Sequence, residues 1–283
     1  MRDLARMMNV KSKLLSTESP LVMGILNVTE DSFYDGGRYT NETAVLKRAE
    51  QILHEGAAII DIGAVSTKPG AADIPMEAEW DRLEKPLALI AKHFPEAIVS
   101  VDTWRAEVAR RSVLAGAAII NDVSGGTFDE RMPEVVGQLH VPYVLMHTTA
   151  KPDKMQQQPL GADMLQVMMQ FFARQMALFK EAGCVDLILD PGFGFGKTLE
   201  QNYFLMKNLS IFHIFECPIL VGISRKSMIY KMLNTSPDEA LTGTVALNML
   251  ALQQGAAILR VHDVREAVET VKVFTMYKNS DCQ

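Results

Sequence analysis

Polar side chains that can bind a ligand follow short apolar runs at several places in this chain. Asp102 follows IVSV, Asn121 follows AAII and Asp190 follows LIL. Carboxylate and amide oxygens of this kind accept hydrogen bonds from the adjacent N–H donors of a flat, guanidine-like edge. The alternative is that each residue only caps the helix after its strand. Three such residues, with Lys226 after another apolar run, favour a binding site.

A second group of residues is basic. The segment SRKS (224–227) follows LVGI, and Arg260 and His262 lie in ILRVH near the C-terminus. The loops after the last two strands of an α/β barrel usually form a phosphate-binding site. Guanidinium, ammonium, hydroxyl and imidazole groups together suit a di- or triphosphate. An exposed cluster of surface charge is the alternative.

Asn27 and His147 also follow apolar runs, MGIL and YVLM. One amide oxygen, completed by waters and phosphate oxygens, is a common way to hold Mg²⁺, which retains its waters. We therefore predict that Asn27 is a magnesium ligand. No second His or Cys accompanies His147, which we expect to be packed or to lie at the edge of a substrate.

The segment 190–198, DPGFGFGKT, is rich in glycine but fits neither nucleotide motif. Pro191 stands where a Walker A loop needs Gly, and Lys197 stands where a dinucleotide fingerprint needs Gly. What remains is a turn whose glycines let the backbone approach a ligand. We expect Phe193 and Phe195 to form aromatic walls beside that ligand.

Eight dense runs of Val, Ile, Leu and Ala predict strands that are buried on both faces. They span 21–27, 57–62, 97–102, 118–122, 142–147, 186–190, 218–223 and 257–261. Segments with apolar residues at a spacing of 3.6 predict helices between them. These span roughly 42–55, 77–93, 105–115, 129–139, 163–182, 199–208, 238–254 and 264–277.

Strands that alternate with helices in this way predict an α/β protein, a (β/α)8 TIM barrel in a single domain. We place the barrel at 21–278, an N-terminal extension at 1–20 and a flexible tail at 279–283. A hairpin within 10–15 is expected to cap the bottom of the barrel. Two long loops, Thr29–Asn41 and Val65–Met76, are expected to close over substrate.

Composition argues against several kinds of partner. A formal net charge of −6 disfavours a general nucleic-acid or membrane-surface binder. We find neither a run of the ~20 apolar residues that a membrane span needs nor a secretory signal. The spacing of Cys184, Cys217 and Cys282 suits no disulfide or metal site, so a reducing cytoplasm is the predicted compartment.

Seven ordered motifs at strand ends together resemble those of the dihydropteroate synthase family, and the resemblance extends from about Val10 to Val273. The motifs are MGILNVTEDSFYDGG (23–37), DIGAVSTKPG (61–70), SVDT (100–103), INDVSGG (120–126), DPGFGFGKT (190–198), GISRKS (222–227) and RVHDV (260–264). The resemblance implies a folate-pathway transferase that condenses 6-hydroxymethyl-7,8-dihydropterin diphosphate with 4-aminobenzoate. It also implies Mg²⁺, a homodimer and a target of sulfonamides.

The resemblance also assigns residues to three parts of one site. The pterin pocket would be lined by Asp102, Asn121, Met146, Asp190 and Lys226. The diphosphate and its Mg²⁺ would be held by Asn27, Lys68, Arg260 and His262. The aminobenzoate would be surrounded by Phe33, Thr67, Lys68, Pro69, Phe195 and Ser227. Catalysis would depend on Arg260, Lys226, Asp102 and His262.

The chain departs from the family pattern at three positions. Glu30 stands where the family usually has Pro, Lys68 where it has Arg, and Val65 where it often has Glu. Lysine keeps the charge but loses the planar fork, so we expect altered affinity rather than lost activity. Two other readings stay open: a pterin-binding methyltransferase, which needs no grip on diphosphate, and a non-catalytic pterin-binding or scaffold protein.

Overall fold

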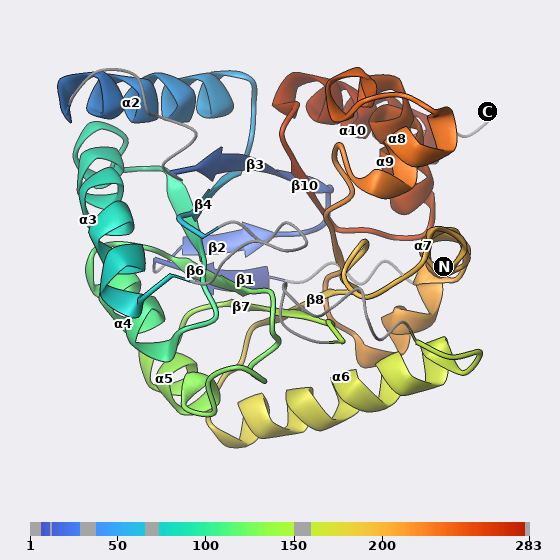
Figure 1. Cartoon of the computed structure of the whole chain (residues 1–283), viewed down its shortest axis with the longest axis horizontal. Coiled ribbons are helices and arrows are strands. Elements are labelled where there is room, and N and C mark those ends of the chain that lie inside the picture. The colour runs from blue at the N-terminus through green and yellow to red at the C-terminus, as the bar shows by residue number, and fades with distance from the viewer. Residues whose placement is uncertain (1–6, 12, 29–37, 66–73, 150–159, 281–283) are drawn as a thin grey trace.

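The computed structural model describes residues 7–11, 13–28, 38–65, 74–149 and 160–280. Eight parallel strands run through the middle of the molecule, and helices surround them (Figure 1). The strands are β3 (Leu21–Asn27), β4 (Ile59–Gly63), β5 (Ile98–Asp102), β6 (Ile119–Asp122), β7 (Tyr143–Met146), β8 (Leu187–Asp190), β9 (Leu220–Val221) and β10 (Ile258–Val261).

The strands form a closed ring, which confirms the predicted barrel. Neighbours follow the order β8-β7-β6-β5-β4-β3-β10-β9, and a parallel bridge between Leu189 and Ile219 joins the two ends. The backbone N–H of Leu189 donates to the carbonyl of Pro218 at 2.9 Å across this junction. Since every strand is parallel, all eight carboxyl ends meet at one mouth, where barrel enzymes place their active sites.

Helices cover the outside of the ring, and their apolar faces pack on the strands. They are α2 (Arg38–His54), α3 (Met76–His93), α4 (Ala106–Leu114), α5 (Met132–Leu139), α6 (Met164–Glu181), α7 (Leu199–Lys207), α8 (Ser227–Leu233), α9 (Leu241–Gln253) and α10 (Val264–Asn279), with 3-10 helices η1 (Leu209–Phe215) and η2 (Pro237–Glu239). Gly116, just after α4, has a φ of +105°, a conformation that glycine adopts without strain. Among the described helices, none is long and apolar enough to span a membrane.

A short antiparallel hairpin at the N-terminus closes the bottom of the barrel, as predicted. It consists of β1 (Met7–Val10) and β2 (Lys13–Ser16). Met8 and Val10 are each 1% exposed and pack against the lowest inward side chains of the strands, including Ile59 and Ile188. The backbone N–H of Asn9 donates to Asp186 at 3.0 Å and ties the hairpin to the start of β8.

The inward side chains of the strands change from apolar to polar along the barrel axis. Side chains two residues apart on a strand share a face, so Ile188 in the lower layer is followed by Asp190 in the upper one. The same step leads from Ile59 to Asp61 and from Ile258 to Arg260. The lower layer is therefore a packed apolar plug, and the upper layer gathers charge at the mouth.

The chain between β9 and α9 differs most from the predicted elements. The strand predicted at 218–223 is only Leu220–Val221, and α8 occupies a segment for which no helix was predicted. A helix of seven residues makes less than two full turns, so it is too short to show a clear apolar period. Pro237 begins η2, and α9 therefore starts at Leu241 rather than at 238.

A buried pair on the outer face of the ring fixes the loop after β6. Tyr143 donates from its hydroxyl to Asp122 at 2.6 Å, and its ring stacks on Phe179 at 4.2 Å. The same carboxylate accepts from the backbone N–H groups of Ser124 and Gly126. Burial raises the pKa of Asp122, and these donors oppose that rise.

Replacing Tyr143 with Phe is expected to lower the free energy of unfolding by about 1–3 kcal/mol, the usual cost of leaving one buried acceptor short of a donor. Urea unfolding followed by circular dichroism measures the change. Tyr277→Phe is the matched control, because Tyr277 is 65% exposed on α10. Equal losses in the two variants would contradict a specific role for the Tyr143 hydroxyl.

Candidate active site

Arg260 holds two carboxylates together inside the mouth of the barrel. Its Nε donates to Oδ2 of Asp61 at 2.6 Å, and a terminal nitrogen donates to Oδ2 of Asp102 at 2.8 Å. Both carboxylates are buried, and the guanidinium is 20% exposed. Charge-assisted hydrogen bonds of this kind are stronger than neutral ones. Burial lowers the pKa of Arg260, but the charges of Asp61 and Asp102 outweigh that effect, so the pKa lies above its ordinary value.

Asp61 and Asp102 share the single guanidinium of Arg260, so these three side chains carry a net negative charge when both carboxylates are ionised. Burial raises the pKa of Asp102 to about 7, which the guanidinium of Arg260 opposes and the charge of Asp61 reinforces. Asn121 donates from its amide to Asp61 at 3.1 Å. Among the described atoms, the second oxygen of Asp61 has no hydrogen-bond partner although its side chain is fully buried. That oxygen is an acceptor available to a ligand.

The register of the sheet explains why side chains from distant parts of the sequence meet. Asn27, Gly63, Asp102 and Asn121 are successive partners across β3, β4, β5 and β6. A Cβ atom placed on Gly63 would lie 3.7 Å from both Oδ1 of Asn27 and Oδ2 of Asp102. The absence of a side chain at Gly63 thus keeps open the space between the amide and the carboxylate.

Asp190, at the end of β8, and Lys226, after β9, are a second pair of opposite charges at the mouth. Asp190 is 6% exposed and accepts from the backbone N–H of Gly192 at 2.7 Å. Burial raises the pKa of Asp190, and the ammonium of Lys226 is the main group that opposes the rise. Burial also lowers the pKa of Lys226 to about 8. Lys226 donates to the carbonyl of Phe193, and its Nζ lies 4.2 Å from the centre of the Phe195 ring.

His262 lies at the end of β10 as a neutral donor. Burial and the charge of Arg260 lower its pKa to about 4. Ser224 accepts from the backbone N–H of His262 and contacts its Nδ1 at 3.1 Å. We assign the Ser224 hydroxyl hydrogen to the contact with Nδ1, since its oxygen already accepts the backbone N–H, and therefore the ring hydrogen to Nε2. Arg48 on α2 donates to the carbonyl of His262 at 2.7 Å and fixes this corner.

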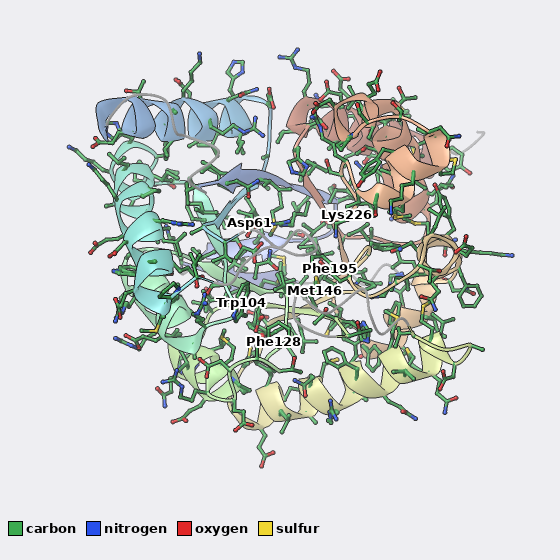
Figure 2. All side chains as sticks on the ribbon, in the orientation of Figure 1. Asp61, Trp104, Phe128, Met146, Phe195 and Lys226 are labelled. Atoms are coloured by element: carbon green, nitrogen blue, oxygen red, sulfur yellow. The ribbon has the colours of Figure 1, made fainter. Side chains whose placement is uncertain are left out.

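Apolar side chains form one wall of the mouth. Trp104, Val123 and Met146 are buried together, and Val65, Phe128 and Phe195 pack against them. The rings of Trp104 and Phe128 meet edge to face with centroids 6.3 Å apart. Figure 2 shows this wall within the ring of helices, together with the charged Asp61 and Lys226. A flat ring would therefore meet charge at its edges and apolar surface at its face.

The structure brings most of the predicted site residues to this one mouth. Those present are Asn27, Asp102, Asn121, Met146, Asp190, Phe195, Lys226, Ser227, Arg260 and His262. Phe33, Thr67, Lys68 and Pro69 lie outside the described residues, as do most of the two long loops. His147 is packed, 3% exposed, with its ring 4.9 Å from that of Phe171.

Two details of the prediction are wrong. Phe193 is not a wall of the site, because its side chain is fully buried in the core between strands and helices. Arg225 is not a free cation for phosphate. It donates to both carboxylate oxygens of Asp263, at 2.6 and 3.0 Å, and also contacts Asp238.

Three residues of the site were assigned no role in binding or catalysis from the sequence. Asp61 ends an apolar run just as Asp102 does, so its position at a strand end was the signal that it belongs with the others. Trp104 directly follows SVDT and packs at the mouth. Lys197 was considered only for its place in a nucleotide motif, yet it is a buried cation behind Asp190.

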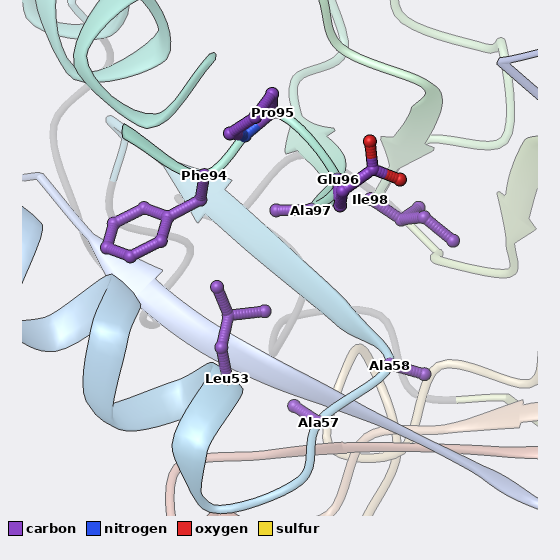
Figure 3. Close-up of a pocket in the computed structure, with 8 residues that line it drawn as sticks. All are labelled: Leu53, Ala57, Ala58, Phe94, Pro95, Glu96, Ala97 and Ile98. Carbon is purple, nitrogen blue, oxygen red and sulfur yellow. The ribbon is translucent and has the colours of Figure 1, made fainter. Parts of the chain in front are cut away.

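A pocket of about 330 Å³ lies at the opposite end of the barrel (Figure 3). It is lined by Leu53, Ala57, Ala58 and the segment 94–98, at the amino ends of β4 and β5. Glu96 is the one ionisable side chain in this lining. The pocket lacks the convergent polar groups of the mouth, and this end of a barrel usually serves stability.

Comparison of the sequence with known proteins finds a pterin-binding family and relatives that are dihydropteroate synthases. Residues 23–262 match the family described as pterin binding enzyme. The dihydropteroate synthase of Escherichia coli (strain K12) is 44% identical over 261 residues, 92% of either chain. That of Bacillus subtilis (strain 168) is 40% identical over 280 residues, 98% of this chain and 95% of the relative.

Solved structures of dihydropteroate synthases are also similar to this chain. The Yersinia pestis dihydropteroate synthase, in a complex with a sulfonamide drug, superposes with a TM-score of 0.91 at 40% identity, covering 97% of this chain and 100% of that one. The Xanthomonas albilineans dihydropteroate synthase with 4-aminobenzoic acid gives 0.90 at 35% identity, covering 98% and 100%. The chain belongs to the pterin-binding enzyme family and, within it, to the dihydropteroate synthases.

Proposed function

We propose that the mouth of the barrel joins 6-hydroxymethyl-7,8-dihydropterin diphosphate to 4-aminobenzoate and yields 7,8-dihydropteroate and diphosphate. The observation that carries this proposal is the division of one mouth into an acidic half and a basic corner. Asp61, Asp102 and Asp190 supply acceptors, while Arg260 links the acidic half to His262. A pterin has a donor-rich edge and its diphosphate is an anion, so one substrate needs both parts.

The pterin is assigned to the acidic half. Asp190 can accept both N–H groups of the guanidine-like edge, as a carboxylate accepts a bidentate Arg. Asn121 and Asp102 end β6 and β5, farther round the same ring of strands, and Lys226 supplies a donor for a ring carbonyl. Met146 belongs to the apolar wall and offers its polarisable thioether to the ring face.

The diphosphate is assigned to the corner formed by Asn27, Arg260 and His262, with Lys68 added on the grounds of sequence alone. A neutral His262 whose Nε2 bears the hydrogen can donate to a phosphate oxygen without carrying charge itself. Asn27 is at the exposed end of β3 and directs an amide oxygen over Gly63.

Mg²⁺ fits this corner if the substrate supplies most of its ligands. Among the described residues there is no group of three or more acidic, His or Cys side chains that could hold a metal by itself. A single hard oxygen from Asn27, with diphosphate oxygens and waters, matches the ordinary preference of Mg²⁺. When bound, the ion would neutralise charge on the departing diphosphate.

The 4-aminobenzoate is assigned to the outer part of the mouth, beside Phe195 and Ser227. Phe195 is half-buried beside Lys226, and Ser227 begins α8. Phe33, Thr67, Lys68 and Pro69 complete this subsite in the proposal on sequence resemblance. A sulfonamide that imitates aminobenzoate would occupy the same place, and the Yersinia pestis dihydropteroate synthase does form a complex with a sulfonamide drug.

The proposed order of steps is departure of diphosphate and then attack by the amine. The bond between the exocyclic methylene carbon and the diphosphate oxygen breaks, and its electron pair leaves with diphosphate. Arg260 and the Nε2 hydrogen of His262 stabilise that negative charge. Asp102 and its neighbours stabilise the cation left on the pterin. The amine nitrogen then forms the new C–N bond, and its surplus proton passes to solvent or diphosphate.

A coupled assay for diphosphate release tests the proposal. Sustained release over many turnovers, with formation of 7,8-dihydropteroate, is expected only when the pterin diphosphate and 4-aminobenzoate are both present. A pterin-binding methyltransferase or a non-catalytic pterin binder would release none. Calorimetric titration of the pterin diphosphate with and without Mg²⁺ separately tests Asn27, because binding that ignores the metal would remove its proposed role.

The homodimer is also a proposal, supported by apolar side chains exposed on helices in the C-terminal part of the chain. These are Ile211 and Ile214 on η1, Met232 and Leu233 on α8, Leu250 on α9, and Val273, Met276 and Tyr277 on α10. Helices α8, α9 and α10 lie together on one side of the molecule (Figure 1). An exposed apolar region of this kind marks a protein interface.

Analytical ultracentrifugation is expected to find the wild-type protein at twice the chain mass and the Met276→Glu variant at the chain mass. Leu114→Glu is the matched control, since Leu114 is 70% exposed on α4 and Met276 is 74% exposed on α10. A monomeric wild type, or equal dissociation of both variants, would contradict the assigned interface. Cys184 is a buried thiol, which supports a reducing compartment, and we assign the enzyme to the cytoplasm.

A further inference from the structure

Lys197 is a buried cation that the proposed reaction does not use. Its side chain lies behind the glycine-rich loop 190–198 and is 4% exposed. Its Nζ donates to the carbonyls of Gly192 at 2.9 Å and Phe195 at 3.0 Å, and it lies 3.3 Å from Nδ1 of His147. Three acceptors match the three hydrogens of an ammonium group. An ammonium cannot accept, so Nδ1 of His147 must be the unprotonated ring nitrogen.

The environment of His147 agrees with this arrangement. Burial, reinforced by the charge of Lys197, lowers the pKa of His147 to about 2, so the ring is neutral and can accept. Burial also lowers the pKa of Lys197 to about 7, while the carboxylate of Asp190 favours its charged form. The three acceptors and the nearby carboxylate oppose the effect of burial, so Lys197 is a cation on the acid side of pH 7.

The loop in front of Lys197 is packed too tightly to move freely. A Cβ atom on Gly192 would lie 2.0 Å from the carbonyl oxygen of His147, and Gly192 has a φ of +70°. Asn202 on α7 accepts from the backbone N–H of Gly194 and donates to the carbonyls of Lys197 and Thr198. Two side chains thus anchor the loop from behind, and only Lys197 brings a charge.

The front of the same loop faces the proposed pterin. The carbonyl of Phe193 accepts from Lys226, the Phe195 ring lies beneath that ammonium, and Asp190 begins the loop. The charged and titratable groups around Asp190 are Lys226 from the loop after β9, Arg260 on β10, and Lys197 with neutral His147 behind the loop. Asp190 therefore has a cation on each side of its loop.

We propose that Lys197 is a positioning residue that holds the 190–198 loop in place and keeps Asp190 ionised for pterin recognition. The inference rests on the proposed function, since it assigns the pterin to Asp190. An ionised carboxylate accepts both donors of the pterin edge, whereas a protonated one loses an acceptor. Lys197 does this without touching the substrate, through two backbone carbonyls and through its charge.

The test is the pH dependence of pterin binding, measured by calorimetry with 6-hydroxymethylpterin on Lys197→Met and wild-type protein. Wild-type affinity should fall as acid protonates Asp190. Without the second cation, the pKa of Asp190 rises, so this fall should begin at higher pH. We call the pH range over which affinity falls the acid limb. A shift of this limb by about one pH unit is expected, which makes binding about tenfold weaker at any pH within it. Titration of the ligand itself cancels in the comparison.

Two further variants separate charge from anchoring. Lys197→Arg keeps a cation but cannot present three tetrahedral donors, so its acid limb should stay at the wild-type pH even if affinity falls. Asn202→Ala loosens the same loop without removing charge, so it should also weaken binding without moving the limb. Thermal unfolding shows whether each variant folds. If Lys197→Met does not fold, Lys197→Gln takes its place, because its amide can still donate to a loop carbonyl while the charge is removed, and its acid limb should move as expected for Lys197→Met.

An unmoved acid limb in folded Lys197→Met, or a moved limb in Lys197→Arg, would overturn the electrostatic role. A limb that shifts as far in Asn202→Ala would do the same, because loosening alone would then account for it. Failure of the wild-type protein to bind any pterin is a different result, since it overturns the proposed function together with this inference.

Discussion

Replacing Arg260 with Met is expected to lower turnover by about 10²–10³-fold, the usual loss when a preorganised donor to a developing negative charge is removed. Arg260 is the proposed donor to the departing diphosphate. It is also the partner of both Asp61 and Asp102, so the substitution leaves two buried carboxylates without their cation. Steady-state diphosphate release measures the first effect.

The same substitution is expected to lower the free energy of unfolding by about 3–5 kcal/mol near neutral pH, as breaking a buried ion pair usually does. The loss should depend on pH in a fixed direction. In the folded protein the pKa of Asp102 is about 7, above its value in an unfolded chain, so stability from this group falls as pH rises toward 7. Without Arg260 that pKa rises further, and the variant should be least stable on the alkaline side.

Two controls distinguish these effects. Arg260→Lys keeps the charge and loses the two-pronged contact, so it should retain most of the stability and little of the turnover. Arg131→Met removes a surface guanidinium whose side chain is 67% exposed, and neither quantity should change. Normal turnover in folded Arg260→Met would show that the diphosphate end has been misassigned.

The sequence predicted the barrel because strands buried on both faces are unusually apolar. The run IVSVD illustrates how far this signal reaches. Its apolar residues predicted the strand, and its terminal Asp102 was placed at the mouth because parallel strands end together. Placing these side chains at the mouth required no knowledge of their contacts. It required only the rule that functional residues of a barrel lie at the carboxyl ends of its strands.

What the sequence could not predict is set by contacts between distant residues. Asp61 and Asp102 looked alike in sequence, but Asp61 contacts both Arg260 and Asn121 and so lies at the centre of the cluster. Phe193 and Phe195 are two residues apart in one loop, yet one lies in the core and the other at the mouth. The positive φ values of the neighbouring glycines turn the chain between them, and no apolar period encodes that turn.

Replacing Asp190 with Asn is expected to weaken pterin binding strongly with little change in the fold. Asn has nearly the same shape, and its oxygen can still accept from the backbone N–H of Gly192. The proposed pterin contact consists of two hydrogen bonds to a charged acceptor, each worth about 1.5–3 kcal/mol. Losing the charge and one acceptor should weaken pterin binding by roughly 10²–10⁴-fold.

Asp186→Asn is the matched control, because Asp186 precedes the same strand at its opposite end and accepts from the N-terminal hairpin. It changes the same net charge at the bottom of the barrel, where no substrate is proposed to bind. Calorimetry with pterin diphosphate and the rate of diphosphate release should therefore separate the two variants. If folded Asp190→Asn turned over normally, the acidic half of the mouth could not be the pterin site. The assignment of Lys226 and the inference on Lys197 would then fail with it, since both are argued from their place beside this carboxylate.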